Sequence, residues 1–186
     1  MGLPLISFIS RLDNFVATNP NLNHQFLLNN VATFTWRGVG GRTVAKTLQY
    51  DLPGPVVASF APEIFLQLGT NDLSRLEALV AGSSIEELVT ILHNTYNVKL
   101  IYVCQTLLGS DPVFNTRVRA FNKNVKTFLE ALPYVFFWEH RGFWNASQRV
   151  LAPDGVHLNR QGQYEFFRSL RGAVLKSLRI CSIVDH

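Results

Sequence analysis

The sequence predicts a single α/β domain built on an open sheet of parallel strands. Short apolar segments, each followed by turn residues, alternate with amphipathic helical patterns along all 186 residues. That alternation is typical of successive strand–helix–strand units with right-handed connections, which produce a three-layer, doubly wound sheet. The chain is 47% hydrophobic and 16% charged, so it can bury one core. We therefore expect residues 1–186 to form one domain.

Five apolar segments are the predicted strands of this sheet. In chain order they are the short Leu3–Ile6, then Gln25–Thr35, Ile64–Leu68, Lys99–Val103 and Val135–Glu139. The last three read IFLQL, KLIYV and VFFWE, which are nearly continuous apolar runs, as expected for parallel strands with both faces covered. The arrangement predicted is a flavodoxin-like sheet of about five parallel strands, the first of them short.

Amphipathic helices are predicted between the strands, because apolar residues recur there at spacings of three and four. One apolar stripe consists of Phe114, Val118, Phe121, Val125, Phe128 and Leu132, and another of Tyr164, Phe167, Leu170, Val174 and Leu178. Two overlapping capping boxes, which start at Ser83 and Ser84, predict the beginning of a further helix.

Composition excludes several classes of protein. No apolar run approaches the roughly 18 to 20 residues that a membrane span requires. The first residues show no secretory signal, so a cytoplasmic location is expected. Cys104 and Cys181 lie in apolar surroundings with no second ligand nearby, which favours buried free thiols over a disulfide or a metal site.

The charge is unevenly distributed along the chain. The net charge is +4, and from Arg117 onward there are eleven basic residues against five acidic ones. This asymmetry could favour a nucleic acid or another phosphate-rich partner. The basic residues are spread out rather than clustered, which favours solvated helix faces instead. The sequence carries no signal for the oligomeric state.

Two of the loops that follow predicted strands carry groups that suit catalysis: one has a possible nucleophile and the other a possible anion-binding site. In doubly wound sheets ligands bind beyond the carboxyl ends of the strands. Ser7 follows the first strand and is either a helix N-cap or a nucleophile. The loop 37–43 has glycines at 38, 40 and 41, so its backbone N–H groups form either an anion or oxyanion site or an ordinary turn. Its glycine spacing fits neither nucleotide-binding fingerprint, and no cofactor is predicted.

Two further loops carry an amide and a carboxylate–imidazole pair. In Gly69-Thr70-Asn71-Asp72, the Asn71 side chain can donate to developing negative charge, although the tetrapeptide also suits a simple turn. Asp154 precedes His157 by three residues, so its carboxylate can accept the Nδ1 proton and leave Nε2 as a base. No further metal ligands lie near this pair. The other four histidines are interpreted as surface or edge residues.

Taken together, these four blocks resemble the SGNH hydrolases, the superfamily of GDSL-type esterases and lipases. The sharpest matches are LQLGTNDL at 66–73 and APDGVHLNRQGQ at 152–163. With GVGGRTV beside them, the blocks are most similar to the esterase domains of metazoan non-LTR retrotransposon proteins.

The resemblance implies a role for each matching residue. Ser7 is implied to be the nucleophile, His157 the general base and Asp154 the carboxylate that orients it. The implied oxyanion donors are the backbone N–H groups of Ser7 and Gly41 and the side-chain amide of Asn71. Gly69 and Asp72 would support the site. The implied substrate is a small acyl or acetyl ester, with neither cofactor nor metal.

The first block departs from the family pattern. Leu5-Ile6 stands where the family has Gly-Asp before the nucleophile. An inactive SGNH-fold protein that binds a ligand or a nucleic acid through its basic C-terminal half is therefore a second hypothesis. A flavodoxin-like nucleotide binder is disfavoured, because the glycine loop follows the second predicted strand rather than the first.

Overall fold

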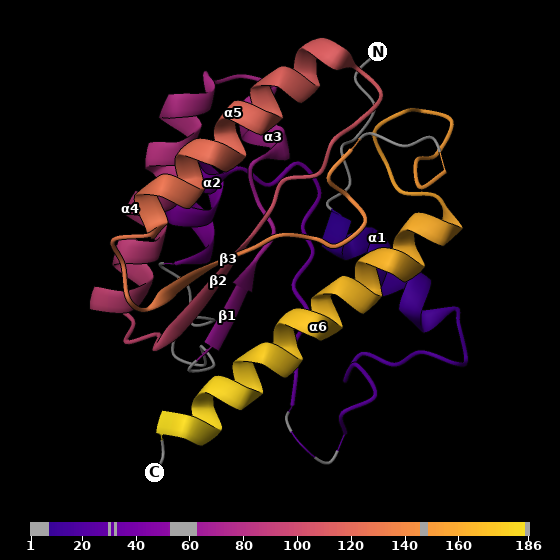
Figure 1. Ribbon diagram of the computed structural model, residues 1–186, viewed down its shortest axis with the longest axis horizontal. Helices are drawn as coiled ribbons and strands as arrows, with labels where there is room; N and C mark the ends of the chain where they lie inside the picture. Colours follow the sequence, from indigo (N-terminus) through magenta and orange to yellow (C-terminus); the bar gives the residue numbers. More distant parts are fainter. Residues whose placement is uncertain (1–7, 30, 32, 53–62, 146–148, 185–186) are drawn as a thin grey trace. The chain divides into compact units, whose positions relative to one another are not determined.

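The computed structural model describes residues 8–29, 31, 33–52, 63–145 and 149–184 (Figure 1). The chain divides into two compact units. Unit 1 combines Met1–Gly40 with His140–His186, and unit 2 is the continuous segment Gly41–Glu139. The predicted strand Leu3–Ile6 lies outside the described residues.

Unit 2 contains a parallel three-stranded sheet. Its strands are β1 (Glu63–Leu66), β2 (Leu100–Cys104) and β3 (Val135–Trp138), in the order β1-β2-β3. Both neighbouring pairs are parallel. The predicted α/β class with a parallel sheet is thus confirmed, and three of the predicted strands form within two residues of their expected bounds.

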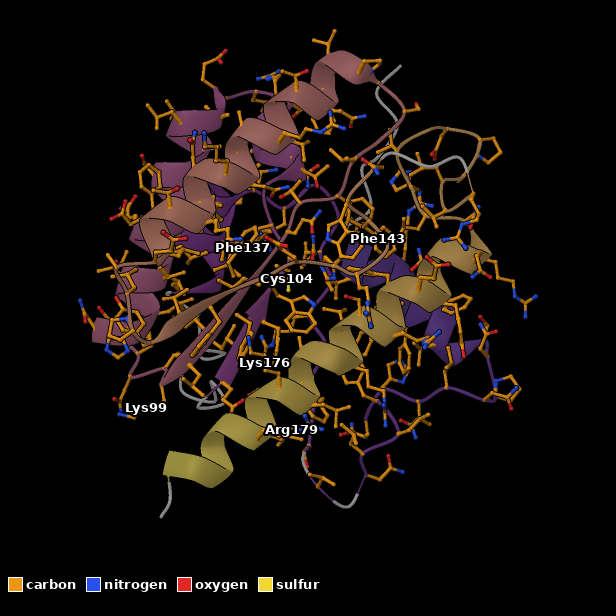
Figure 2. The ribbon with its side chains drawn as sticks, viewed as in Figure 1. Lys99, Cys104, Phe137, Phe143, Lys176 and Arg179 are labelled. Atoms are coloured by element: carbon orange, nitrogen blue, oxygen red, sulfur yellow. The ribbon has the colours of Figure 1, made fainter. Side chains whose placement is uncertain are left out.

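Two helices pack on one face of this sheet. They are α4 (Ala78–Asn94) and α5 (Pro112–Leu129), which follow β1 and β2 along the chain (Figure 1). The strand residues in their shared core are Ile64, Leu66, Ile101, Val103, Val135 and Phe137 (Phe137 is labelled in Figure 2). The alternate strand residues Phe65, Tyr102 and Phe136 occupy matched positions in the register, and their rings stack with centroids 4.8 and 5.2 Å apart. A parallel register with alternating side chains therefore produces a mainly aliphatic core on one face of the sheet and a row of stacked aromatic rings on the other.

The helix α5 begins and packs as its sequence predicts. Asp111 is the N-cap and accepts the backbone N–H of Val113 at 2.8 Å, while Pro112 occupies the first turn, where no N–H is needed. Its predicted apolar stripe is buried at Val118, Phe121, Val125 and Leu129.

The helix α4 begins upstream of its predicted start. Ser83 and Ser84 lie inside the helix, and their hydroxyls donate to the carbonyls of Leu79 and Val80, both at 3.2 Å. The prediction of a start at the capping boxes is therefore wrong. The helix already buries Ala81 and Gly82 ahead of the capping boxes, and the position of Gly82 is within van der Waals distance of the Phe128 ring of α5. Two shorter helices in unit 2 are α2 (Val44–Lys46) and α3 (Thr70–Leu73), and a π-helical turn, η1, spans Thr47–Asp51.

Unit 1 is built on two helices that pack together, α1 (Phe8–Ala17) and α6 (Arg160–Val184). The helix α1 buries Phe8, Leu12 and Val16, and the Phe8 ring meets Phe166 of α6 edge-on at 6.3 Å. The side chains of α6 that are buried include Phe166, Phe167, Leu170, Ala173 and Val174. Tyr164, predicted to belong to the apolar stripe, is 44% exposed, because the buried face begins at the two phenylalanines instead.

The predicted strand Gln25–Thr35 does not form in its described part. Phe26 and Leu27 have φ angles of 53° and 61°, which belong to the left-handed region and are incompatible with a strand. The Asn23 Oδ1 atom accepts the backbone N–H groups of Gln25 and Leu27, at 3.1 and 2.8 Å, and so stabilises a turn. This prediction is wrong because local side-chain hydrogen bonds replace a strand partner.

The apolar residues that made this segment resemble a strand form an aromatic cluster instead. The Phe26 ring contacts Phe34, Trp36 and Phe167, with centroids 5.4, 4.9 and 5.2 Å away. The Gln25 side chain bonds both the N–H and the C=O of Phe34, at 2.8 and 3.2 Å, as a neighbouring strand would. Packing of these aromatic rings therefore stabilises the conformation of the loop.

Two remaining predictions concern the cysteines and membranes. Cys104 is a buried free thiol at the end of β2, as predicted, and burial raises its pKa to about 12 (Figure 2). The side chain of Cys181 lies outside the described part of α6. No helix in the described ranges is long and apolar enough to cross a membrane.

Candidate active site

A carboxylate and an imidazole form a short hydrogen bond in the loop before α6. His157 Nδ1 lies 2.7 Å from Asp154 Oδ2, and the His157 residue is only 6% exposed. Asp154 Oδ1 accepts the backbone N–H groups of Val156 and His157, at 3.0 and 2.9 Å. These hydrogen bonds, first that from the His157 backbone, hold the pKa of Asp154 well below its usual range. The carboxylate is therefore ionised at neutral pH and fixes the imidazole with Nδ1 as donor, so that Nε2 is the basic nitrogen.

Backbone and asparagine hydrogen bonds hold this turn in place. Leu151 and Leu158 form an isolated antiparallel bridge on either side of it. Asn159 is the residue before α6, and its Nδ2 donates to the carbonyls of Arg149 and Leu151, at 2.8 and 3.0 Å. Its Oδ1 accepts the N–H of Gly162 at 2.9 Å, the bond expected of an N-cap. One side chain thus joins the start of α6 to the loop that carries the acid–base pair.

Gly162 allows α6 to begin close to this loop. A Cβ at Gly162 would lie 2.2 Å from the carbonyl oxygen of Val150, a distance that no side chain tolerates. Sequence reasoning included Asn159 and Gly162 in a motif but gave them no role. The signal was present, since asparagine followed three residues later by glycine suits a capped helix start.

The start of α1 lies beside the imidazole. Ser7 is outside the described residues, and its chain neighbour Phe8 is the first residue of α1. The Phe8 ring and the His157 ring have centroids 6.4 Å apart, tilted by 53°. A Cβ at Gly38 would lie 2.3 Å from the backbone nitrogen of Ser10, so the glycine-rich loop packs directly on the first turn of α1. Within unit 1, the glycine loop and the imidazole therefore both adjoin the helix start.

In unit 2, Gly69 makes the turn at the end of β1 possible. Its φ is 108°, and a Cβ there would lie 2.6 Å from Thr106 Oγ1 and 2.7 Å from the Phe121 ring. Both the backbone conformation and the available space therefore require glycine. Close packing against α5 and the loop after β2 therefore explains the glycine at this position.

Asn71 and Asp72 hold the backbone that follows Gly41. Asn71 Nδ2 donates to the carbonyl of Arg42 at 2.8 Å, which uses one of its two N–H groups. Asp72 Oδ1 accepts the N–H of Val44 at 3.0 Å. The Asp72 side chain is buried, its Oδ2 has no hydrogen-bond partner in the described part of the chain, and burial raises its pKa. The tetrapeptide thus fixes residues 42–44.

The model of the GDSL-like lipase/acylhydrolase family matches residues 12–164, which include the 69–72 turn and the Asp154–His157 pair. The chain belongs to this family. Ser7 precedes the matched range. Family members are esterases and lipases that hydrolyse carboxylic esters, and the predicted superfamily is thereby confirmed. No curated protein matches the sequence.

Solved structures of esterases and acylhydrolases have the same fold. A putative acylhydrolase from Bacteroides fragilis is 18% identical, with 90% of this chain and 83% of that one covered and a TM-score of 0.67. A GDSL-like lipase from Bacteroides thetaiotaomicron is 17% identical, with 89% and 84% covered and a TM-score of 0.67. A catalytic mutant of an acetylxylan esterase from Geobacillus stearothermophilus is 16% identical, with 88% and 78% covered and a TM-score of 0.62.

The loop after β2 in this GDSL-type chain was missed by sequence reasoning. Asn122 of α5 bonds both the N–H and the C=O of Thr106, each at 2.9 Å. Asn115 of the same helix bonds both backbone groups of Gly109, each at 2.8 Å. Thr106 Oγ1 in turn donates to the carbonyl of Leu68, next to Gly69, at 2.8 Å. The available signal was two asparagines seven residues apart on a helix that otherwise buries apolar residues.

His140 is a buried structural residue, so its interpretation as a surface or edge residue is wrong. It is fully buried, and its Nδ1 lies 2.9 Å from the hydroxyl of Ser169. Its ring meets Phe143 and Phe166 edge-on (Phe143 is labelled in Figure 2). Burial lowers its pKa to about 3, so it is neutral. Within the described ranges, no group of three or more histidine, cysteine or acidic side chains could hold a metal ion.

Proposed function

We propose that this protein is a serine ester hydrolase that cleaves small acyl or acetyl esters through Ser7, His157 and Asp154. The observation that carries the proposal is the 2.7 Å bond between His157 Nδ1 and Asp154, in a chain of the GDSL-like family. An imidazole held in this way has Nε2 available to accept a proton, which is what a serine hydroxyl requires to become a nucleophile.

The proposed reaction has two steps. Ser7 Oγ attacks the ester carbonyl carbon while His157 Nε2 takes the hydroxyl proton, and the proton passes to the departing alkoxide as the C–O bond breaks. Water then gives a proton to His157 and attacks the carbonyl carbon of the acyl-enzyme. The bond between this carbon and Ser7 Oγ breaks, His157 returns the proton to Ser7 Oγ, and the acid is released. Asp154 keeps its negative charge throughout and stabilises the imidazolium that forms in each step.

The position of Phe8 supports Ser7 as the nucleophile. Adjacent Cα atoms are about 3.8 Å apart, and the Phe8 ring packs beside His157. Ser7 also precedes the first residue of α1, where backbone N–H groups have no partner within the helix and can stabilise an anion.

The proposed oxyanion donors are the backbone N–H groups of Ser7 and Gly41 and the side-chain amide of Asn71. The hydrogen bonds from Asn71 to Arg42 and from Val44 to Asp72 support this assignment, because they hold the backbone next to Gly41. Fixed donors stabilise a tetrahedral intermediate without reorganisation. Gly69 and Asp72 support the oxyanion donors. Residues 1–186 together form the proposed catalytic domain.

The proposed substrate is an ester of a small acyl group. The similar structure of an acetylxylan esterase supports an acetyl ester in particular. The narrower resemblance to retrotransposon esterase domains stays a prediction.

Fluorophosphonate labelling and p-nitrophenyl acetate hydrolysis test the proposal. We expect the wild-type protein to be labelled and active, and Ser7→Ala to lose both labelling and turnover. Ser10→Ala is the matched control, one helical turn further on, and should retain both. Unchanged labelling of Ser7→Ala, or a labelled peptide that maps to Ser10, would contradict the assignment.

A second candidate function is an inactive SGNH-fold protein that binds nucleic acid. It is favoured by Leu5-Ile6 in the first block and by the basic residues of α6, including Lys176 and Arg179 (Figure 2). Phosphate contacts weaken steeply as salt is added. Single-stranded RNA binding at 50 and 200 mM salt distinguishes the two, because absent or salt-insensitive binding argues against this function.

A further inference from the structure

Thr106 joins three segments of unit 2 and takes no part in the proposed reaction. It lies in the loop after β2 and is 0% exposed. Asn122 of α5 accepts its backbone N–H and donates to its C=O, each at 2.9 Å. Its own hydroxyl donates to the carbonyl of Leu68 at 2.8 Å. Thr106 is therefore held by α5 and in turn holds the segment that follows β1.

The Thr106 hydroxyl lies against the peptide group between Leu68 and Gly69. The carbonyl that accepts its hydrogen bond belongs to that peptide group, so the bond sets the orientation of the group. A Cβ at Gly69 would lie 2.6 Å from Thr106 Oγ1, so the hydroxyl also packs against the Gly69 backbone. Gly69 has a φ of 108°, and glycine adopts positive and negative φ angles about equally well. The conformation of this turn therefore depends on an outside contact, which Thr106 supplies.

The short helix α3 links the position of Gly69 to that of Asn71. The helix begins after Gly69, which has no side chain that could cap it. The backbone N–H of Leu73 donates to the Gly69 carbonyl at 2.9 Å and so ties the turn to Gly69. Asn71 lies within this turn, and its amide donates to the carbonyl of Arg42 at 2.8 Å. A shift at Gly69 therefore displaces the Asn71 amide.

We propose that Thr106 is a positioning residue for the Asn71 amide, the side-chain donor of the proposed oxyanion site. The inference rests on the proposed esterase function and adds to it a residue that does not touch the substrate. Asn122 holds Thr106, Thr106 holds the peptide group before Gly69, and α3 then places Asn71. An oxyanion donor acts on charge that develops only in the transition state, so its displacement lowers kcat and leaves KM nearly unchanged.

Three variants test this role through the hydrolysis of p-nitrophenyl acetate. Thr106→Val places a methyl group where Oγ1 lies 2.8 Å from the Leu68 oxygen, closer than the roughly 3.3 Å of a short carbon–oxygen contact, so the turn has to move. We expect kcat to fall about tenfold, with KM changed by less than about twofold. Thr106→Ser keeps the hydroxyl and should restore kcat to near the wild-type value.

Thr116→Val is the matched control, because it makes the same change at an exposed threonine of α5. The Thr116 hydroxyl donates to the carbonyl of Pro112 within its own helix, at 3.1 Å. This variant should leave both kcat and KM unchanged.

The same substitution in the Asn71→Ala background separates positioning of Asn71 from a general loss of structure. Thr106→Val should lower kcat about tenfold when Asn71 is present but less than about twofold once its amide is absent. A residue that only supports the fold would lower kcat by the same factor in both backgrounds. Thr106→Ala removes the hydroxyl without introducing the close methyl contact, and it provides the same comparison if Thr106→Val does not fold.

The side-chain NH2 resonances of Asn71 in ¹H–¹⁵N spectra report on the amide without any substrate. Thr106→Val should shift them, Thr106→Ser and Thr116→Val should leave them near their wild-type positions, and Asn71→Ala assigns them by their loss. Unchanged Asn71 resonances in Thr106→Val, or equal losses of kcat with and without the Asn71 amide, would overturn the inference. Shifted resonances in a protein with no measurable hydrolysis would instead reject the proposed esterase and retain the coupling between Thr106 and Asn71.

Discussion

Local hydrogen bonds give two histidines that are buried in the described part of the chain different chemistry. His157 faces a carboxylate that is itself held by two backbone N–H groups, which makes the ring a candidate base. His140 faces the hydroxyl of Ser169 and aromatic rings, and desolvation keeps it neutral. Spacing to an acidic residue in the sequence identified the first pair, because Asp154 is only three residues away. It could not find the second, because Ser169 is distant in sequence.

His140 should make folding stability depend on pH. Its pKa is lowered from 6.5 to about 3, so between these values the unfolded chain binds a proton that the folded protein excludes. The contribution of His140 to the free energy of unfolding is fully present above about pH 6.5. As the pH drops toward 3, this contribution falls by at most about 1.4 kcal/mol per pH unit. Urea unfolding of wild type and His140→Gln at pH 7, 6 and 5 measures this, and the variant should show the smaller slope. Equal slopes, or a protonated His140 in NMR spectra at pH 5, would refute the prediction.

At the scale of elements, apolar runs predicted strands correctly where the whole segment is apolar. The segments that became β1, β2 and β3 are each a continuous apolar run, and the pairing of parallel strands needs little more. Gln25–Thr35 has enough aromatic residues to resemble a strand, but Asn23 and Gln25 satisfy its backbone through their side chains. Sequence periodicity reports how apolar a segment is, and it does not report which groups accept its hydrogen bonds.

The loop after β2 depends on α5 in a way that one substitution can test. Asn122→Ala removes both hydrogen bonds to Thr106 and leaves its backbone N–H and C=O without these partners. The expected loss of folding stability is about 1–3 kcal/mol, measured by urea unfolding. Asn124→Ala, on the same helix with no side-chain hydrogen bond among those found in the described residues, is the matched control and should change stability by less than about 0.5 kcal/mol. Equal effects of the two substitutions would contradict the role of Asn122.

At the scale of the whole molecule, the chain connectivity favours cooperative folding. Unit 1 is made from the two ends of the chain, and unit 2 is the segment between them. When unit 1 is folded and unit 2 is not, residues 41–139 form a closed loop whose ends are held together. The entropy cost of closing a loop grows only with the logarithm of its length, but it is absent when unit 2 is folded. Folding of unit 2 therefore stabilises unit 1.

This coupling predicts one unfolding transition for the whole chain, in agreement with the single domain predicted from its length. Trp36 and Trp144 belong to unit 1 and Trp138 to unit 2, so they report on the units separately. In protein labelled with 5-fluorotryptophan, the three ¹⁹F resonances should lose intensity at the same urea concentration and coincide with the loss of far-UV circular dichroism. Single tryptophan-to-phenylalanine substitutions assign the resonances. A Trp138 midpoint that differs from the Trp36 midpoint would contradict this prediction, because it would show that one unit stays folded at a urea concentration at which the other has unfolded.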